Sequence, residues 1–291
     1  MTERTSSARE LWALLEPIHA VTYFSPEPLE AFRAAGYRGF WMGYFAGRAA
    51  PLGPAGAGVV HAVFYNFSPE RVARAVPSAW DFAPPAVALE ARERGSVAAL
   101  RRHLGPAAAD PGLARAAELA SLAAGAAPLE GRVLFAANHA LPEPEDPLSR
   151  LWHAATLLRE HRGDGHVAAL MSAGIGGRES HVFHALSSGT PREVYTVARD
   201  FDDEEWTGHV EALRSRGLAN DQGLTPAGAG LKAEIERLTD DLAAPAYDVL
   251  SDTERDELAT LLRPVARAVV QSGELPLDSP MGLDLRTLLS A

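Results

Sequence analysis

Apolar positions recur at helical spacing through most of the second half of the chain. Residues 148–162 show this spacing, and a shorter run with the same spacing spans 166–174. The sequence Gly-Asp-Gly at 163–165 separates the two runs, and a third run at 177–188 ends directly before Gly189. The pattern therefore predicts three consecutive helices, with a turn at 163–165 between the first and the second.

The segments that follow carry recognisable helix boundaries. A Thr-Pro dipeptide at 190–191 begins one segment, and the acids at 200–205 begin another that ends with two arginines and a glycine. Acids in the first turn of a helix and bases in its last turn both complement the helix dipole. A glycine-bearing turn at 218–224 follows, and a second Thr-Pro dipeptide opens a long segment at 226–243. We expect two helices, a small β hairpin and a long helix in this order.

The first half of the chain resembles the second. Residues 29–53 align with 167–191, and residues 64–80 align with 198–217, in the same order and with similar spacing. The matching positions are Gly36 with Gly174, Gly39 with Gly177, Phe45 with Phe183, and Phe67-Ser68-Pro69-Glu70 with Phe201-Asp202-Asp203-Glu204. Similar segments in a fixed order predict an internal duplication. Chance similarity between two alanine-rich helical stretches is the alternative.

The chain has 291 residues, which is long enough for two units with separate cores. We expect an N-terminal repeat at 1–103, a helical linker at 104–148 and a C-terminal repeat at 149–291. An amphipathic segment at 251–270 predicts one more helix within the second repeat. The predicted fold is mainly α with small β wings, built from tandem repeats with a helical linker and a C-terminal helix.

Composition excludes several classes of chemistry. The chain contains no cysteine, which excludes disulfides, thiolate catalysis and cysteine-ligated metal or iron–sulfur sites. No apolar run approaches the roughly 18 to 20 residues that a membrane span needs. The polar residues 1–12 lack the features of a secretory signal, so we expect a cytoplasmic protein with no membrane partner.

The segment at 180–245 resembles the winged helix-turn-helix of MarR-type regulators. In those proteins a recognition helix leads into "RGL", a β wing, "LTPAG" and a long dimerisation helix, and the same order stands here at 203–243. The whole chain resembles an actinobacterial helix-turn-helix family built from two such halves. The resemblance implies tandem winged-helix-like repeats, and it makes a MarR-like DNA-binding transcriptional regulator one alternative function.

The distribution of charge argues against nucleic acid as a partner. The recognition helix of this fold places its N-terminal residues beside bases and phosphates. Residues 200–216 contain six acids against Arg214 and Arg216, a local net charge of −4 (−6 + 2). Neutralised phosphates supply almost all non-specific affinity for DNA, and the whole chain carries −11. We therefore expect a scaffold that has lost DNA binding.

Three segments of the first half carry polar and aromatic side chains suited to a ligand pocket between the repeats. Gly39, Gly43 and Gly47 share one helix face, where either a flat ligand or a tightly packed neighbouring helix can approach closely. Arg48 either holds the carboxylate or phosphate of a ligand or stabilises the end of its helix. The candidate ligand-binding residues of this half are Trp41, Tyr44, Arg48, Tyr65 and Asn66, and His19 with Tyr23 is a candidate acid–base pair.

The stretch around the Gly-Asp-Gly sequence is rich in ionisable side chains. His153 shares a helix face with His161, and the predicted turn brings His166 back toward His161. Converging imidazoles suit zinc, copper or iron, but these spacings of eight and five residues match no established metal motif. We expect Arg162 and Asp164 to pair with each other or to face a ligand. The alternatives are a ligand-binding corner with Arg162 and His166, an acid–base pair of His161 with Asp164, a metal or haem site, and a purely structural corner.

The leading interpretation is a cytoplasmic protein that binds a small-molecule ligand in a pocket between two winged-helix-like repeats. The sequence contains no GxSxG elbow and no phosphate-binding loop that would identify a reaction. The protein is therefore expected to be either an enzyme of specialised metabolism or a ligand-responsive module. One alternative is the MarR-like regulator. The other is a haem- or divalent-metal-dependent protein with ligands among His19, His153, His161 and His166. We expect a monomer or a homodimer.

Overall fold

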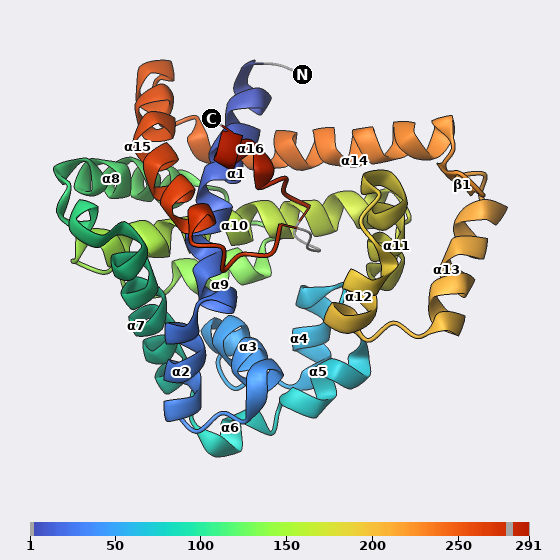
Figure 1. Ribbon diagram of the computed structural model, residues 1–291, viewed down its shortest axis with the longest axis horizontal. Helices are drawn as coiled ribbons and strands as arrows, with labels where there is room; N and C mark the ends of the chain where they lie inside the picture. Colours follow the sequence, from blue (N-terminus) through green and yellow to red (C-terminus); the bar gives the residue numbers. More distant parts are fainter. Residues whose placement is uncertain (1–2, 278–281, 291) are drawn as a thin grey trace.

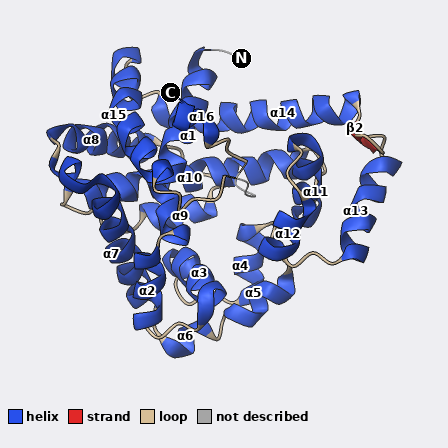
Figure 2. Cartoon of the chain, viewed as in Figure 1, coloured by secondary structure: helices blue, strands red, loops and turns tan. Residues whose placement is uncertain are grey.

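The computed structural model describes residues 3–277 and 282–290, and these residues are mostly helical (Figure 2). The first part comprises α1 (Glu3–Phe24), α2 (Pro26–Ala34), α3 (Gly39–Ala49), α4 (Ala57–Phe64), α5 (Pro69–Ala75), α6 (Ala79–Phe82) and α7 (Pro85–Leu104). The remainder comprises α8 (Pro111–Ala126), α9 (Val133–His139), α10 (Pro147–Ser172), α11 (Gly177–Ser188), α12 (Arg192–Arg199), α13 (Asp203–Ser215), β1 (Ala219–Asn220), β2 (Gly223–Leu224), α14 (Pro226–Ala243), α15 (Asp252–Gln271) and α16 (Arg286–Ser290). Among the helices described, none has the length and apolar character needed to cross a bilayer.

Helix α10 runs through the middle of the molecule and packs against α1, α7, α8, α9 and α14 (Figure 1). Its residues Leu151 and Trp152 are buried in the largest hydrophobic core, which α1, α7, α8 and α15 complete. A second core around Phe45 and Phe67 is formed by the segment from α2 to α7, with Leu134 of α9. A third core around Tyr195 joins the C-terminal end of α10 to α11–α14. Each half of the chain therefore has a small core of its own, attached to a shared one.

The helix break predicted in the Gly-Asp-Gly sequence is wrong, because α10 continues through it. A Cβ atom on Gly165 would lie 2.8 Å from Nη1 of Arg132 and 3.3 Å from Cβ of Leu242, so this glycine permits close packing inside the helix. The neighbouring Asp164 accepts a hydrogen bond from the N–H of Phe135 in α9 at 2.9 Å. These tertiary contacts outweigh the weak helix propensity of the tripeptide.

The element boundaries predicted between 200 and 243 are confirmed. The carboxylate of Asp202 accepts the N–H of Glu205 at the start of α13, and the hydroxyl of Thr225 accepts the N–H of Gly228 at the start of α14. Strands β1 and β2 form an antiparallel hairpin between these two helices. The caps and the turn are local features, which is why the sequence alone predicts them.

A β wing predicted in the first half is wrong for the residues that the structure describes. There, the short helix α6 and turns connect α5 to α7. Within the residues that the structure describes, the sheet consists of the hairpin in the second half. The aligned segments nevertheless begin helices at matching positions. Helices α3 and α11 start at Gly39 and Gly177, and α5 and α13 start at Pro69 and Asp203. The internal duplication itself stays a prediction.

The segment predicted as a linker forms α8 and α9, and α8 is a layer of the largest core. Ala116, Ala120 and Ala123 are fully buried, and their small side chains let α8 approach α10 closely. The predicted C-terminal amphipathic helix is α15, which packs against α1, α7 and α8. The division of the chain into two repeats and a linker stays a prediction.

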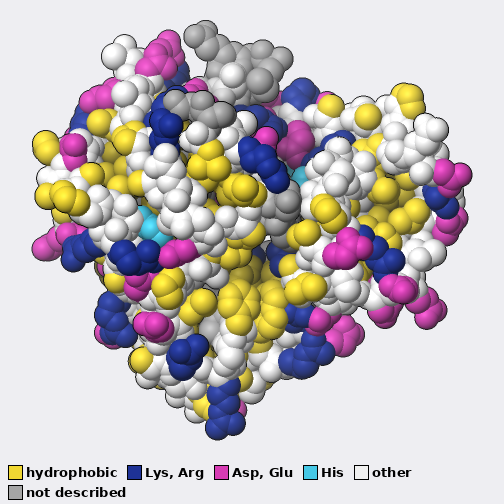
Figure 3. Space-filling model, in the orientation of Figure 1, with side chains coloured by type: hydrophobic (Ala, Val, Ile, Leu, Met, Phe, Trp, Pro, Cys, Tyr) yellow, Lys and Arg dark blue, Asp and Glu magenta, His cyan; other side chains and the backbone are white. Residues whose placement is uncertain are grey.

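An apolar area lies near the middle of one face of the molecule, over α3 and α4 (Figure 3). Phe40 of α3 is 41% exposed, and Val197 of α12 is 79% exposed. Both side chains also line the internal cavity of the protein. Exposed apolar residues gathered in this way mark an opening or a binding surface more often than scattered ones do.

Candidate functional site

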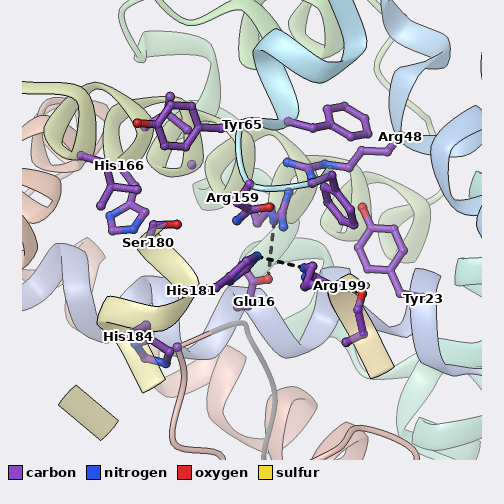
Figure 4. A pocket seen from close by; sticks show the side chains of 18 of the residues that line it. Glu16, Tyr23, Arg48, Tyr65, Arg159, His166, Ser180, His181, His184 and Arg199 are labelled. Carbon is purple, nitrogen blue, oxygen red and sulfur yellow. Dashed lines mark hydrogen bonds and ion pairs between the residues drawn. The ribbon is translucent and has the colours of Figure 1, made fainter. Parts of the chain in front are cut away.

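A cavity of about 620 Å³ lies between the two halves of the chain. Its volume falls within the usual range for small-molecule sites. Residues of α1, α3 and α4 line it together with residues of α10, α11, α12 and α14, and Figure 4 shows some of these side chains around the cavity. The cavity therefore requires both halves, although each half has its own core.

Aromatic side chains form one wall of the cavity. The ring centroid of Tyr44 lies 4.8 Å from that of Tyr23 and 5.5 Å from those of Trp41 and Phe67. The ring of Phe64 adds a tilted contact with Phe67 at 6.2 Å. Edge-to-face and tilted contacts of this kind hold the rings in a fixed arrangement. The wall is consequently apolar and rigid.

The glycines of α3 allow another helix to pack closely and do not form a groove for a ligand. A Cβ atom on Gly47 would lie 2.4 Å from Cζ of Phe32, and one on Gly43 would lie 3.0 Å from Cβ of the same side chain. Helix α2 therefore occupies this face of α3. Gly39 is the first residue of α3 and has a positive φ of 71°. The interpretation of this face as a groove for a flat ligand is wrong.

Arg48 binds a carboxylate that belongs to the protein. Its Nε and Nη2 donate to the two carboxylate oxygens of Glu160 at 3.2 and 3.3 Å. Nη1 of Arg159 donates to Oε1 of the same carboxylate at 2.7 Å, and Nε of Arg159 lies 3.5 Å from Oε1 of Glu16. Burial alone would raise the pKa of Glu160, but the two arginines hold that pKa far below its usual value. This part of the cavity wall is a buried, charge-balanced network.

Arg199, the last residue of α12, reaches the cavity beside His181 of α11 (Figure 4). Its Nε donates to Nε2 of His181 at 3.2 Å, and its guanidinium carbon lies 4.5 Å from the ring centroid of Phe67. The pKa of Arg199 is lowered to about 10, chiefly by burial, with Tyr44 opposing the shift and Arg48 and Arg71 adding to it. Burial also holds the pKa of His181 well below its usual value. The pair is therefore a charged guanidinium against a neutral imidazole.

The opposite end of the cavity carries a second polar group of side chains, around His166 and His184 (Figure 4). Nδ1 of His166 is hydrogen-bonded to the hydroxyl of Thr239 at 2.9 Å, and Lys232 forms an ion pair with Glu236. Burial lowers the pKa of both histidines to about 4. At neutral pH these imidazoles are uncharged, so they offer a ligand hydrogen bonds without charge.

Asp164 and Arg162 do not pair with each other. Asp164 faces the cavity but accepts the N–H of Phe135 near the start of α9, and burial raises its pKa to about 6. Nη2 of Arg162 donates to Oδ1 of Asp240 in α14 at 3.0 Å, and its guanidinium lies 4.0 Å from the ring centroid of Trp12. Residues two positions apart on a continuous helix point in different directions, which separates these two side chains.

The structure gathers most of the predicted site residues around one cavity. Its lining includes Tyr23, Trp41, Tyr44, Arg48, Tyr65, Asn66, Arg162, Asp164 and His166. His19 lies behind this lining, where its Nε2 is hydrogen-bonded to the hydroxyl of Tyr23 at 3.0 Å. His161 packs against the ring of Phe135 at 5.0 Å, so the proposed acid–base pair of His161 with Asp164 is not formed. What these residues bind or catalyse stays a prediction.

The candidate metal ligands His153, His161 and His166 are not brought together. They lie on one uninterrupted helix, and the turn that was expected to fold His166 back does not exist. His161 faces Phe135 of α9, whereas His166 faces Thr239 of α14. Within residues 3–277 and 282–290, no three histidine or carboxylate side chains converge as a group that could hold a metal ion.

Several charged residues of the cavity were not found by sequence reasoning. Arg159 and Glu160 stand beside the histidine-rich stretch, and this proximity was the one available signal. An arginine at the end of a helix is common because it complements the helix dipole. The position of Arg199 in the sequence therefore did not indicate a role in the cavity. The residues missed were Glu16, Arg159, Glu160, Arg199, Lys232 and Glu236.

Comparison with known proteins identifies a family. The curated proteins contain no match to this chain, and the solved structures contain none either. A family model described as a helix-turn-helix family matches residues 8–276. This match spans most of the chain and includes every helix that lines the cavity. The chain therefore belongs to this helix-turn-helix family.

Proposed function

We propose that this protein binds a small organic molecule in the cavity between its two halves. The observation that carries the proposal is the cavity itself, with a rigid aromatic wall and a few fixed polar groups. Ligand sites generally combine an apolar lining with a small number of placed polar groups. Here Tyr44 and Phe67 supply the first, and Arg199 and His166 supply the second. Two MarR-like winged-helix repeats, derived by duplication, are the scaffold that this proposal assumes.

We also propose that the scaffold does not bind DNA. Helix α13 stands where a recognition helix would be, and its first turn carries Asp203, Glu204 and Glu205. The side chain of Asp203 is 94% exposed despite its ion pair with Arg192, and Arg178 is already bound to Glu205. Because such a surface repels phosphates, it supports ligand binding over regulation through DNA.

The DNA alternative is tested with a fluorescein-labelled duplex of mixed sequence, followed by anisotropy at about 50 mM salt, where non-specific binding is strongest. We expect no change in anisotropy at micromolar protein. An affinity in the micromolar range or tighter that weakens as salt is added would favour the regulator instead.

The ligand-binding proposal is tested by filling the cavity from Gly163. This residue lies in α10 on the cavity wall, and the nearest atom to a Cβ built there is Oε2 of Glu160, at 3.8 Å. A larger side chain therefore has room to enter the cavity. We expect the neutral fluorophore N-phenyl-1-naphthylamine to bind the wild type, and Gly163→Phe to weaken that binding by about tenfold or more.

Gly208→Phe is the matched control for this substitution. Gly208 is exposed on α13, and no atom lies within 4 Å of a Cβ built on it. We expect this variant to bind the fluorophore as the wild type does. Equal binding by the wild type and Gly163→Phe would place the fluorophore outside the cavity and contradict the proposal.

A further inference from the structure

We infer that the ligand of this cavity is an organic anion and that Arg199 binds its negative charge. The inference rests on the proposed function, to which it adds a class of ligand and a recognition residue. It begins from the charge balance of the cavity. The other bases of the lining have carboxylate partners: Glu160 for Arg48 and Arg159, Asp240 for Arg162, and Glu236 for Lys232. Among the residues described, no carboxylate forms an ion pair with Arg199.

Neutral groups hold Arg199 in place. Its Nε donates to Nε2 of His181 at 3.2 Å, and its Nη1 donates to the carbonyl oxygen of Ala198 at 3.0 Å. Only an unprotonated Nε2 accepts such a bond, and the burial of His181 keeps its imidazole unprotonated. These contacts fix the direction of the guanidinium without neutralising its charge.

The carboxylates nearest Arg199 are bound to other arginines. Glu160 forms an ion pair with Arg48. The adjacent residue, Asp200, has a positive φ of 57° and binds Arg71 and Arg74 of α5 instead, with 2.6 Å between its Oδ2 and Nε of Arg71. A half-buried cation with neutral partners is unfavourable, so an anion that enters the cavity is attracted by the guanidinium.

The aromatic wall determines the rest of the ligand. The guanidinium of Arg199 lies over the ring of Phe67, and the ring of Tyr44 continues the apolar surface beyond it at 5.5 Å. A carboxylate or sulfonate on a flat apolar body places its charge on Arg199 and its body against these rings. A small inorganic anion lacks the body and leaves the wall uncovered.

Two fluorophores with one aromatic skeleton test this inference. 8-Anilinonaphthalene-1-sulfonate differs from neutral N-phenyl-1-naphthylamine only by its sulfonate group. We expect the wild type to bind the sulfonate about tenfold tighter or more, as a charge-assisted contact requires. Arg199→Gln is expected to abolish this preference by weakening the sulfonate alone, whereas Arg199→Lys, which keeps the charge, is expected to retain most of it.

Arg192→Gln is the control for the change in charge. Arg192 stands on the same helix, forms an ion pair with exposed Asp203 and does not line the cavity. Removing its charge alters the net charge of the protein as Arg199→Gln does. We expect both fluorophores to bind this variant with wild-type affinities.

The outcomes separate the inference from the proposed function. Equal wild-type affinities for the two fluorophores, both weakened by Gly163→Phe, would overturn the inference and leave the proposed function standing. Loss of both fluorophores in an Arg199→Gln variant that unfolds normally in urea would show that Arg199 shapes the cavity, and this too would overturn the inference. Insensitivity of both fluorophores to Gly163→Phe would refute the proposed function itself.

Discussion

Among single residues, Glu160 of α10 determines how the side chains of Arg48 and Arg159 are arranged in the cavity wall. Its side chain is 2% exposed, and those of Arg48 and Arg159, which bind it, are 12% and 18% exposed. Glu160→Gln leaves two largely buried arginines without the carboxylate they share. We expect the free energy of unfolding in urea to fall by about 3 kcal/mol.

Glu90→Gln provides the comparison for this substitution. Glu90 pairs with Arg94, and their side chains are 69% and 59% exposed, so water already screens the pair. We expect a change within about 0.5 kcal/mol. Equal effects of the two substitutions would mean that the buried network does not stabilise the fold.

His161 makes stability depend on pH. Its Nε2 is buried without a hydrogen-bond partner in the described structure, and burial lowers its pKa to about 3, with Arg132 adding to the shift. The unfolded chain has a histidine pKa of about 6.5, so it takes up the proton first as pH falls. The stability present above that pH is therefore lost progressively toward the folded pKa.

His161→Phe keeps an aromatic ring against Phe135 and removes the titrating group. Between pH 7 and pH 5 we expect the wild type to lose about 1 to 2 kcal/mol more unfolding free energy than this variant. Urea unfolding at both values measures the difference. Parallel losses in the two proteins would show that His161 is protonated in the folded state.

The sequence could predict which residue types suit a ligand pocket, but not which partners their side chains bind. Tyr44 and Arg48 were expected at a pocket because aromatic and arginine side chains suit one, and both line the cavity. The partner of Arg48 stands 112 positions away, at Glu160, and no local pattern relates the two. The direction of the Arg199 side chain likewise depends on how α11 and α12 pack. Which carboxylate each arginine binds is thus determined by the fold and not by the local sequence.

Among the elements, α10 shows where local patterns fail. The glycines at 163 and 165 predicted a turn, but both lie inside a helix, where one has open space beside it and the other is closely packed. A Cβ atom on Gly163 meets no atom closer than 3.8 Å, whereas one on Gly165 would lie 2.8 Å from Arg132. The elements around α13 and α14 were predicted correctly because their caps are local, and α10 was not because its continuity depends on α9 and α14.

The two glycines of α10 therefore respond differently to alanine. Gly163→Ala is expected to raise the free energy of unfolding by about 0.5 to 1 kcal/mol, because it removes a flexible residue from a helix interior. Gly165→Ala is expected to lower it by about 1 to 3 kcal/mol, because the added methyl displaces Arg132. Thermal and urea unfolding of both variants measure these changes. Stabilisation by both substitutions would contradict the packing described for Gly165.

In the whole molecule, the cavity lies where the two halves of the chain meet. Helices α3 and α11, which start at aligned positions, both contribute residues to its lining. Sequence similarity predicted a pocket between halves, and the expected position agrees with the cavity. The sequence similarity could not predict the shared core, since α8 and α15 have no counterpart in the aligned segments. A separate unfolding of the two halves is therefore not expected.

The same arrangement bears on the oligomeric state. The sequence predicts a MarR-type second half, and in MarR-type proteins the long helix corresponding to α14 forms the dimer. Here α14 packs against α1 and α10 of its own chain, and Asp240 of α14 binds Arg9 at 2.7 Å. Its outer side carries Glu234, Arg237 and Asp241, which pair with one another and leave a charged surface. Helix α14 is thus packed within its own chain, against a helix of the first half.

We therefore expect the protein to be a monomer of 31.0 kDa in solution. Size-exclusion chromatography with light scattering, run at two concentrations that differ about a hundredfold, measures the mass directly. A constant mass near that of one chain is the expected result, because the apolar side of α14 is buried within the molecule. A mass twice as large at both concentrations would mean that another surface forms a stable interface, and the exposed apolar residues Phe40 and Val197 would be the first to substitute.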